Sequence, residues 1–247
     1  MKYKVKKHLP ITEIFGHEVA CILSEKIKTV HKSFDAKSFY SYIIHHVKNK
    51  RYQERVEIVA DAINKHLPKE YSEAISILRK IFGPPNPHET GMFKNYYWLL
   101  PIAKYVEKYG INHFNISIQT IAEVTKRCTG EYAIRAFAKK YPNKTLNVCT
   151  RWALHQDFHL RRLASEGLRP KLPWAKKLYL WNDNPDPIFK ILELLKEDEV
   201  RFVKKSVANH LRDWTKINPH YTNKILSRWS KSRNPNTIWI VQYAQRK

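Results

Sequence analysis

Apolar residues recur at intervals of three and four along most of the chain, with Lys, Arg and Glu between them. This spacing gathers the apolar side chains on one face of an α-helix. It is clearest in residues 56–66, 71–81, 118–128 and 187–195. Alternating apolar and polar runs, which predict strands, are nearly absent. We therefore predict an all-α fold.

Proline and asparagine interrupt the helical pattern at 67–68, 83–87, 141–143, 184–187, 218–219 and 234–235. These residues predict turns between helices. The longest loop-like stretch is 83–91, and the same helical pattern resumes on both sides of it. We therefore expect residues 1–247 to form a single domain.

One pattern repeats at an offset of 43 residues: Leu160-Arg-Arg-Leu-Ala is echoed by Val203-Lys-Lys-Ser-Val. HEAT-type helix pairs repeat at about 40–47 residues, and each pair buries its apolar face against the next. The echo therefore favours a right-handed α-solenoid of HEAT-like helix pairs. Stacking of equivalent helices is expected to place the basic dipeptides Arg161-Arg162 and Lys204-Lys205 along one basic concave groove.

The net charge of the chain indicates what kind of partner it binds. The chain has 45 Lys and Arg against 22 Asp and Glu, a formal net charge of +23. Residues 151–247 alone carry 20 basic against 9 acidic residues, so the excess is spread over the folded body. Such a surface predicts binding to a polyanion.

The cysteines and the hydropathy pattern indicate the compartment. Cys21, Cys128 and Cys149 lack CxxC spacing and are odd in number, which favours reduced thiols. No apolar stretch approaches the length of a membrane span, and no apolar core follows the basic N-terminus. We expect a soluble cytoplasmic protein.

The densest group of polar residues lies in residues 159–175, which hold Arg161, Arg162, Arg169, Lys171 and Trp174. Basic side chains near a helix end, followed by a proline-broken turn with an aromatic residue, suit phosphate binding and base or sugar stacking. The alternative is a solvated basic face with the tryptophan packed between repeats.

Two acids stand out in this basic chain. Glu131 lies near Arg135 and Tyr132, and Asp213 follows Arg212. Such acids are most often surface ion pairs. If both project into one groove, they supply negative charge where a sugar oxocarbenium ion develops, as cleavage of an N-glycosidic bond requires.

Other chemistry has little support. His155 and His159 are four residues apart but lack the Glu of an HExxH motif and an obvious third ligand. The phosphate-binding, dinucleotide-binding and serine-esterase motifs are all missing from the sequence. We expect no metal and no cofactor.

Three motifs, residues 131–135, 159–175 and 206–213, occur in the order in which they stand in the AlkC branch of the AlkC/AlkD DNA alkylation-repair superfamily. The chain resembles that family from about Ile14 to at least Trp229. The resemblance implies a HEAT-like solenoid that grips and bends DNA. It also implies a monofunctional glycosylase that releases cationic bases, chiefly 3-methyladenine, and leaves an abasic site.

The resemblance also implies roles for single residues. Glu131 and Asp213 match the acids that face the damaged nucleotide. Together with the basic pattern, it gives this set of expected DNA contacts: Tyr132, Arg161, Arg162, Arg169, Lys171, Trp174, Lys204, Lys205 and Arg212.

The sequence departs from the family pattern at three positions. Tyr132 stands in place of Phe, Ala136 in place of Pro, and Arg212 in place of the Asn of an NHLND motif. Arg212 is placed by the sequence to pair with Asp213, which would weaken that acid. Some relatives carry a C-terminal immunoglobulin-like domain, which we do not expect here.

The expected partner is double-stranded DNA containing alkylated bases, bound by a monomer, with no membrane. When it is bound to DNA, the protein is expected to be associated with the nucleoid. Two alternatives remain at this point. One is a non-catalytic HEAT-repeat protein that binds damaged or branched DNA by shape. The other is a helical protein associated with RNA or the ribosome.

Overall fold

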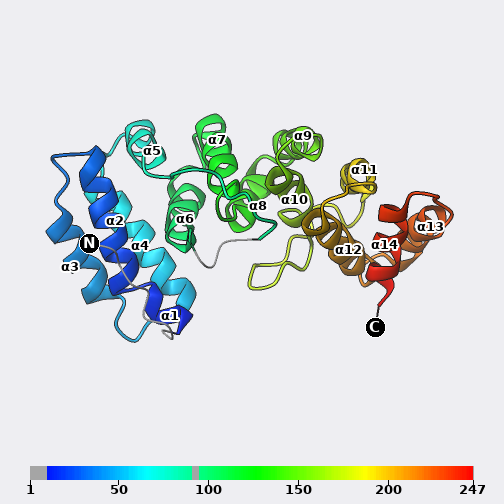
Figure 1. The fold of residues 1–247 in the computed structure, drawn as a ribbon, viewed down its shortest axis with the longest axis horizontal. Coiled ribbons are helices and arrows are strands. Elements are labelled where there is room, and N and C mark those ends of the chain that lie inside the picture. Colours follow the sequence, from blue (N-terminus) through cyan, green and yellow to red (C-terminus); the bar gives the residue numbers. More distant parts are fainter. Residues whose placement is uncertain (1–9, 91–94, 247) are drawn as a thin grey trace. The chain divides into compact units, whose positions relative to one another are not determined.

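The computed structural model describes residues 10–90 and 95–246, and every regular element in them is a helix (Figure 1). The all-α prediction is confirmed. The described residues fall into two compact units. The first comprises residues up to 84 together with 93–124, and the second comprises 85–92 together with 125–247. The single-domain expectation stays a prediction.

The first unit is a cluster of packed helices around an aliphatic core. Its buried residues include Leu23, Ile43, Ile63 and Ile102. Helix α2 packs on α3, α3 on α4, and α4 on α6. The elements are α1 (Ile11–Ile14), α2 (His17–Val30), α3 (Ala36–His46), α4 (Tyr52–His66), α5 (Tyr71–Arg79), η1 (Tyr97–Leu99), α6 (Leu100–Tyr109) and α7 (Phe114–Thr125), whose last residue belongs to the second unit.

The second unit stacks its helices in two rows. Helix α12 packs on both α10 and α14, which makes one row, while α9 contacts α10 and α11, and α13 contacts α12 and α14. This alternation is the packing of HEAT-like helix pairs. The helices are α8 (Glu131–Lys140), α9 (Pro142–Ala153), α10 (Phe158–Glu166), α11 (Asp186–Leu195), α12 (Arg201–Thr215), α13 (Pro219–Trp229) and α14 (Pro235–Gln245).

The 43-residue echo marks two neighbouring helices of this row. Leu160 of α10 and Val203 of α12 occupy the same repeat position and are both buried, as are Ala164 and Val207. The two helices pack directly on each other, so the echo predicted equivalent stacked helices correctly. The handedness of the solenoid and its basic groove stay predictions.

Several predicted turns are the starts of helices. Pro142, Pro219 and Pro235 are the first residues of α9, α13 and α14. Proline favours this position because its fixed φ suits a helix and its missing N–H has no partner there. Asn218 and Asn234 precede two of these prolines, and their side chains accept hydrogen bonds from the first turn.

The four clearest helical patterns correspond to α4, α5, α7 and α11. Helix α7 begins at Phe114, one turn before the predicted segment, and ends at Thr125. No helix in the described residues is long and apolar enough to cross a lipid bilayer.

The loop segment 85–90 is tied to the second unit. The Asn86 N–H donates to the Lys126 carbonyl at 2.9 Å, and the Asn86 carbonyl lies 3.0 Å from Nε2 of buried His159. Glu89 Oε2 accepts a hydrogen bond from the Phe202 N–H at 3.2 Å. These contacts fix the start of α12 and, with it, the Phe202 ring.

Candidate active site

Glu131 begins helix α8, directly after Gly130. The N-terminus of a helix carries partial positive charge and favours a carboxylate. The side chain is buried, and Oε2 lies 2.9 Å from Nη1 of Arg162. Oε2 nevertheless accepts no hydrogen bond from any described residue, so Arg162 lies beside this oxygen without directing an N–H at it. One buried carboxylate oxygen is therefore left for another donor.

Helix α10 places Arg162 and Glu166 one turn apart on the same face. It begins after Asp157, whose carboxylate accepts a hydrogen bond from the His159 N–H at 2.8 Å. Arg162 Nη2 lies 3.7 Å from Oε1 of Glu166. The guanidinium carbon of Arg162 also lies 4.4 Å from the centre of the Phe202 ring. Two acids and one aromatic face thus fix the Arg162 side chain.

Arg169 continues the charge pattern from α10 to α12. Its Nη1 donates to Oε1 of Glu166 at 2.7 Å. Its Nε and Nη2 donate to the two carboxylate oxygens of Asp213 at 3.0 and 3.3 Å. The Lys171 N–H donates to Asp213 Oδ2 at 3.3 Å. Both oxygens of Asp213 are therefore held by protein donors.

Five residues form one chain of alternating charge, which we call the ionic network: Glu131, Arg162, Glu166, Arg169 and Asp213. Two expected acids, far apart in the sequence, are its two ends. Three carboxylates and two guanidiniums leave one negative charge in excess within the network.

Backbone contacts hold the centre of the ionic network in place. The Arg135 guanidinium donates to the carbonyls of Gly167, Arg169 and Lys176 at 3.1, 2.6 and 2.6 Å. At Gly167 an added Cβ would lie 2.5 Å from Cγ2 of Ile134. Glycine is therefore required for the end of α10 to approach α8 this closely.

The surroundings of the ionic network keep Glu166 charged and the neighbouring His210 neutral. Burial raises the pKa of Glu166, but attraction to Arg162 and then Arg169 outweighs it, and the pKa is lowered overall. Burial, followed by repulsion from Arg169, holds the pKa of His210 well below its usual value. Glu166 is therefore ionised at neutral pH, and the fully buried His210 is uncharged.

Arg212 does not pair with Asp213, and the expectation that it does is wrong. Its Nη2 donates to the Tyr243 carbonyl at 2.6 Å, and its Nε lies 3.4 Å from the Ala244 carbonyl. Neighbouring residues on a helix point in different directions. The cation on Asp213 is Arg169, whereas Arg212 reaches the end of α14.

The structure places the other expected DNA contacts in different surroundings. Arg161 is bound by Asp198, 2.5 Å from its Nε, and Lys204 Nζ donates to Asn236 at 2.8 Å. Tyr132 is half-buried. The side chains of Lys171 and Lys205 have no ion-pair partner among the described residues.

Trp174 lies in the loop between α10 and α11. It is 67% exposed, and its φ of 62° is in the left-handed region. This conformation costs a non-glycine residue about 1–2 kcal/mol of free energy. The alternative that Trp174 packs in the core between repeats is wrong.

Two residues of the site were missed in the sequence. Glu166 had a signal, because it lies four residues after Arg162 and three before Arg169, a spacing that brings charges together on a helix. The sequence showed Arg135 only as a neighbour of Glu131, and it gave no signal of the partners of Arg135, which are backbone carbonyls far along the chain.

The two histidines considered as metal ligands have separate partners. His155 Nδ1 accepts a hydrogen bond from the Asp157 N–H at 2.9 Å, whereas His159 contacts the Asn86 carbonyl. The thiols of Cys128 and Cys149 are buried, as expected of small apolar residues, and burial raises the pKa of Cys149 to about 12.

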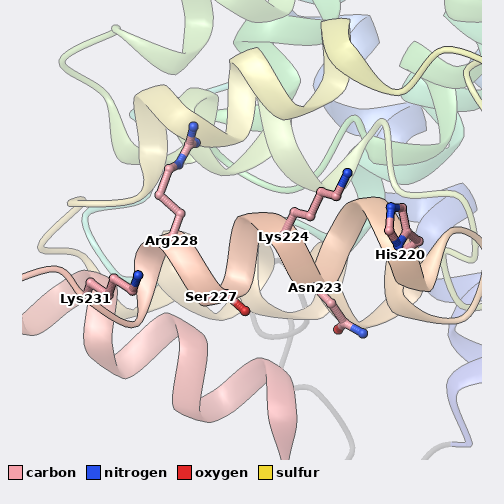
Figure 2. Close-up of a pocket in the computed structure, with 6 residues that line it drawn as sticks. All are labelled: His220, Asn223, Lys224, Ser227, Arg228 and Lys231. Carbon is pink, nitrogen blue, oxygen red and sulfur yellow. The ribbon is translucent and has the colours of Figure 1, made fainter.

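An open depression lies along α13 (Figure 2). One of its cations, Arg228, forms an ion pair with Glu193 at 2.5 Å. No residue of the ionic network lines it. Its lining residues are His220, Asn223, Lys224, Ser227, Arg228 and Lys231.

The chain is similar to known proteins in both sequence and structure. Residues 117–247 match the sequence model of a family described as DNA alkylation repair enzyme. The chain is 34% identical over 237 residues to YhaZ, an uncharacterized protein of Bacillus subtilis (strain 168), covering 96% of this chain and 64% of that protein. The structure is similar to that of Pseudomonas fluorescens AlkC, an alkylpurine DNA glycosylase bound to DNA containing an abasic site analog. The TM-score is 0.85 at 31% identity, over 96% of this chain and 64% of that one. The chain thus spans less than two thirds of the length of either protein.

Proposed function

Because the chain belongs to the family of DNA alkylation repair enzymes, we propose that it is a monofunctional DNA glycosylase. Its substrates are cationic N-alkylated bases in double-stranded DNA, chiefly 3-methyladenine, and its product is an abasic site. The observation that carries this proposal is the ionic network, which joins Glu131 and Asp213 through the half-buried Arg162 and the buried Glu166 and Arg169. The similarity to AlkC, whose structure is a complex with DNA, supports DNA as the partner.

Cleavage of the glycosidic bond does not require the protein to protonate the leaving base. An N3-alkylated adenine already carries positive charge, so the base leaves with the electron pair of the glycosidic bond without being protonated first. Positive charge then develops on the sugar, and carboxylates fixed in a buried site stabilise it. Asp213, whose two oxygens are held by Arg169 and the Lys171 N–H, is suited to this electrostatic role.

Glu131 is suited to activate water. Its Oε2 is buried and accepts no hydrogen bond from the described residues. A water bonded there gives its proton to Glu131 as its oxygen bonds to the sugar carbon, and the sugar is left as an abasic site. Arg162, Arg169 and Trp174 are proposed to contact the DNA around the lesion. The two arginines also hold the acids.

Release of free base from methylated duplex DNA tests this function. We expect Glu131→Gln and Asp213→Asn each to slow release by about two to four orders of magnitude. Glu199→Gln and Asp183→Asn, which change exposed acids of the same unit, serve as matched controls and should retain the wild-type rate. Wild-type rates in the two active-site variants would overturn the assignment.

The non-catalytic alternative predicts a different result in the same experiment. A protein that binds damaged or branched DNA by shape would bind DNA junctions tightly and release no base. Preference for RNA over DNA at matched salt would favour the other alternative, a helical protein associated with RNA or the ribosome.

A further inference from the structure

A second group of cations lies on α12 and at the end of α14, two helices packed on each other (Figure 1). Trp239 and Tyr243 are one turn apart on α14, and their rings stack with centroids 4.8 Å apart and planes 18° apart. Lys204 Nζ lies 5.5 Å from the Trp239 centroid. The guanidinium carbons of Arg212 and Arg246 lie 5.4 and 5.0 Å from the Tyr243 centroid. We call these five residues the α12–α14 site.

Within the part of the chain that the structure describes, neutral groups hold the cations of this site. Lys204 donates to the Asn236 amide oxygen, and Arg212 donates to the Tyr243 carbonyl. None of its three cations forms an ion pair with a carboxylate of the described residues. The rings and amides fix the positions of the cations without neutralising them.

This combination is what an anion site requires. Ordering a long basic side chain costs conformational entropy, and here much of that ordering has already taken place in the free protein. Lys204 and Arg212 are eight residues apart on one helix, a separation of about 12 Å at 1.5 Å per residue. The site therefore suits an extended polyanion rather than a single small anion.

We propose that the α12–α14 site binds the phosphate backbone of duplex DNA flanking the lesion, and that Trp239 and Tyr243 preorganise its cations. A duplex carries one phosphate per about 1.7 Å of axis, so cations spaced along two helices each meet a phosphate. The inference extends the proposed function, because it assigns a second contact with the same DNA.

The test is binding of an undamaged duplex across a range of salt concentrations, which requires no base release. Each of Lys204→Gln, Arg212→Gln and Arg246→Gln should lower the slope of log affinity against log salt by about 0.9, and the triple variant by about 2.7. The matched control is a triple variant at Lys190 of α11, Lys224 of α13 and Lys231 just after α13, which are exposed cations, with the same total charge change.

A second variant pair tests the aromatic rings at constant charge. Tyr243→Leu should weaken duplex binding several-fold, whereas Tyr243→Phe should retain wild-type affinity because the ring face remains. Circular dichroism melts establish that both variants are folded. Equal affinity of the Leu and Phe variants would overturn the preorganising role.

The outcomes separate this inference from the proposed function. Base release by the wild type, with unchanged salt slopes in the α12–α14 variants, would overturn the site and leave the glycosylase. Reduced slopes without base release would support the site and overturn the glycosylase. Slopes reduced equally by the control triple variant would also overturn the site.

Discussion

The second unit holds its arginines in two different ways. In the ionic network, Arg162 and Arg169 each lie within ion-pair distance of carboxylates from two residues. In the α12–α14 site, Arg212 is held by carbonyls and an aromatic ring. The first arrangement fixes acids for chemistry and leaves little net charge, whereas the second fixes cations and leaves their charge to an external anion.

The difference shows that an arginine in a basic protein is not by itself a phosphate contact. Arg161 illustrates this, because Asp198 binds it within the protein. What neutralises the guanidinium decides what it is free to bind. Four predictions probe this contrast between the two regions.

The largest expected effect is on stability. Arg169→Met leaves the carboxylates of Glu166 and Asp213 buried without their shared cation, and removing one partner of such a group costs about 3–5 kcal/mol. Arg212→Met loses only contacts to neutral groups and should cost about 1–2 kcal/mol. Urea unfolding of both variants measures the difference. Equal losses would show that the two regions do not differ in this way.

The next prediction concerns Glu166 as a positioning residue. Glu166→Gln retains its shape but removes the charge shared by Arg162 and Arg169, so both guanidiniums act more fully on Glu131 and Asp213. We expect base release to slow about 10-fold, less than the loss of a group that meets the reacting atoms. We also expect the acidic limb of the pH profile to move to lower pH. A slower reaction with an unmoved pH profile would indicate a merely structural role.

A smaller effect is expected in the dependence of stability on pH. The pKa of His210 is lowered well below 6.5 in the folded state, so below pH 6.5 the unfolded chain takes up a proton that the folded chain does not. The free energy of unfolding should therefore fall as the pH falls below 6.5, by up to about 1.4 kcal/mol per pH unit for this group.

His159 contributes in the same direction, because burial also lowers its pKa. His210→Gln should therefore reduce the slope between pH 6.5 and 5.5 without abolishing it. Glu166 acts at lower pH, since the stability from its lowered pKa is present above about pH 4.5 and is lost as the pH falls further. A slope unchanged by His210→Gln would contradict the assignment.

The smallest effect is expected where the α12–α14 site is made to resemble the ionic network. Asn236→Asp gives Lys204 a carboxylate partner in place of an amide. We expect the salt slope of duplex binding to fall by about one, with a stability change of about 1 kcal/mol or less for a half-buried pair. An unchanged slope would indicate that Lys204 meets no phosphate.

Much of the fold was predictable from the sequence because its cause is local. The three- and four-residue spacing of apolar positions predicted helices, and the prolines at 142, 219 and 235 lay at their first residues. The echo of Leu160 at Val203 predicted two helices of one row, because equivalent repeats bury equivalent positions. Helix ends were predicted less well, as α7 illustrates, because they depend on contacts outside the helix.

The candidate site was predictable only in part. Motif resemblance selected Glu131 and Asp213, but proximity in the chain suggested the wrong cation for Asp213. Arg212 is its neighbour in sequence, yet Arg169 is its partner in space. Side-chain direction on a helix turns by about 100° per residue, so adjacent residues rarely share a partner.

The sequence by itself determined the helical class, the repeat and the excess of positive charge, because these depend on residue type and spacing. The choice of Glu131 and Asp213 as the two acids came from the motif resemblance and stays a prediction. Only the tertiary structure decided which cations are neutralised, since an ion pair forms between side chains that packing brings together from different helices. It joined Glu131 to Asp213 through Arg162, Glu166 and Arg169, and it left the cations of α12 and α14 without an acid among the described residues.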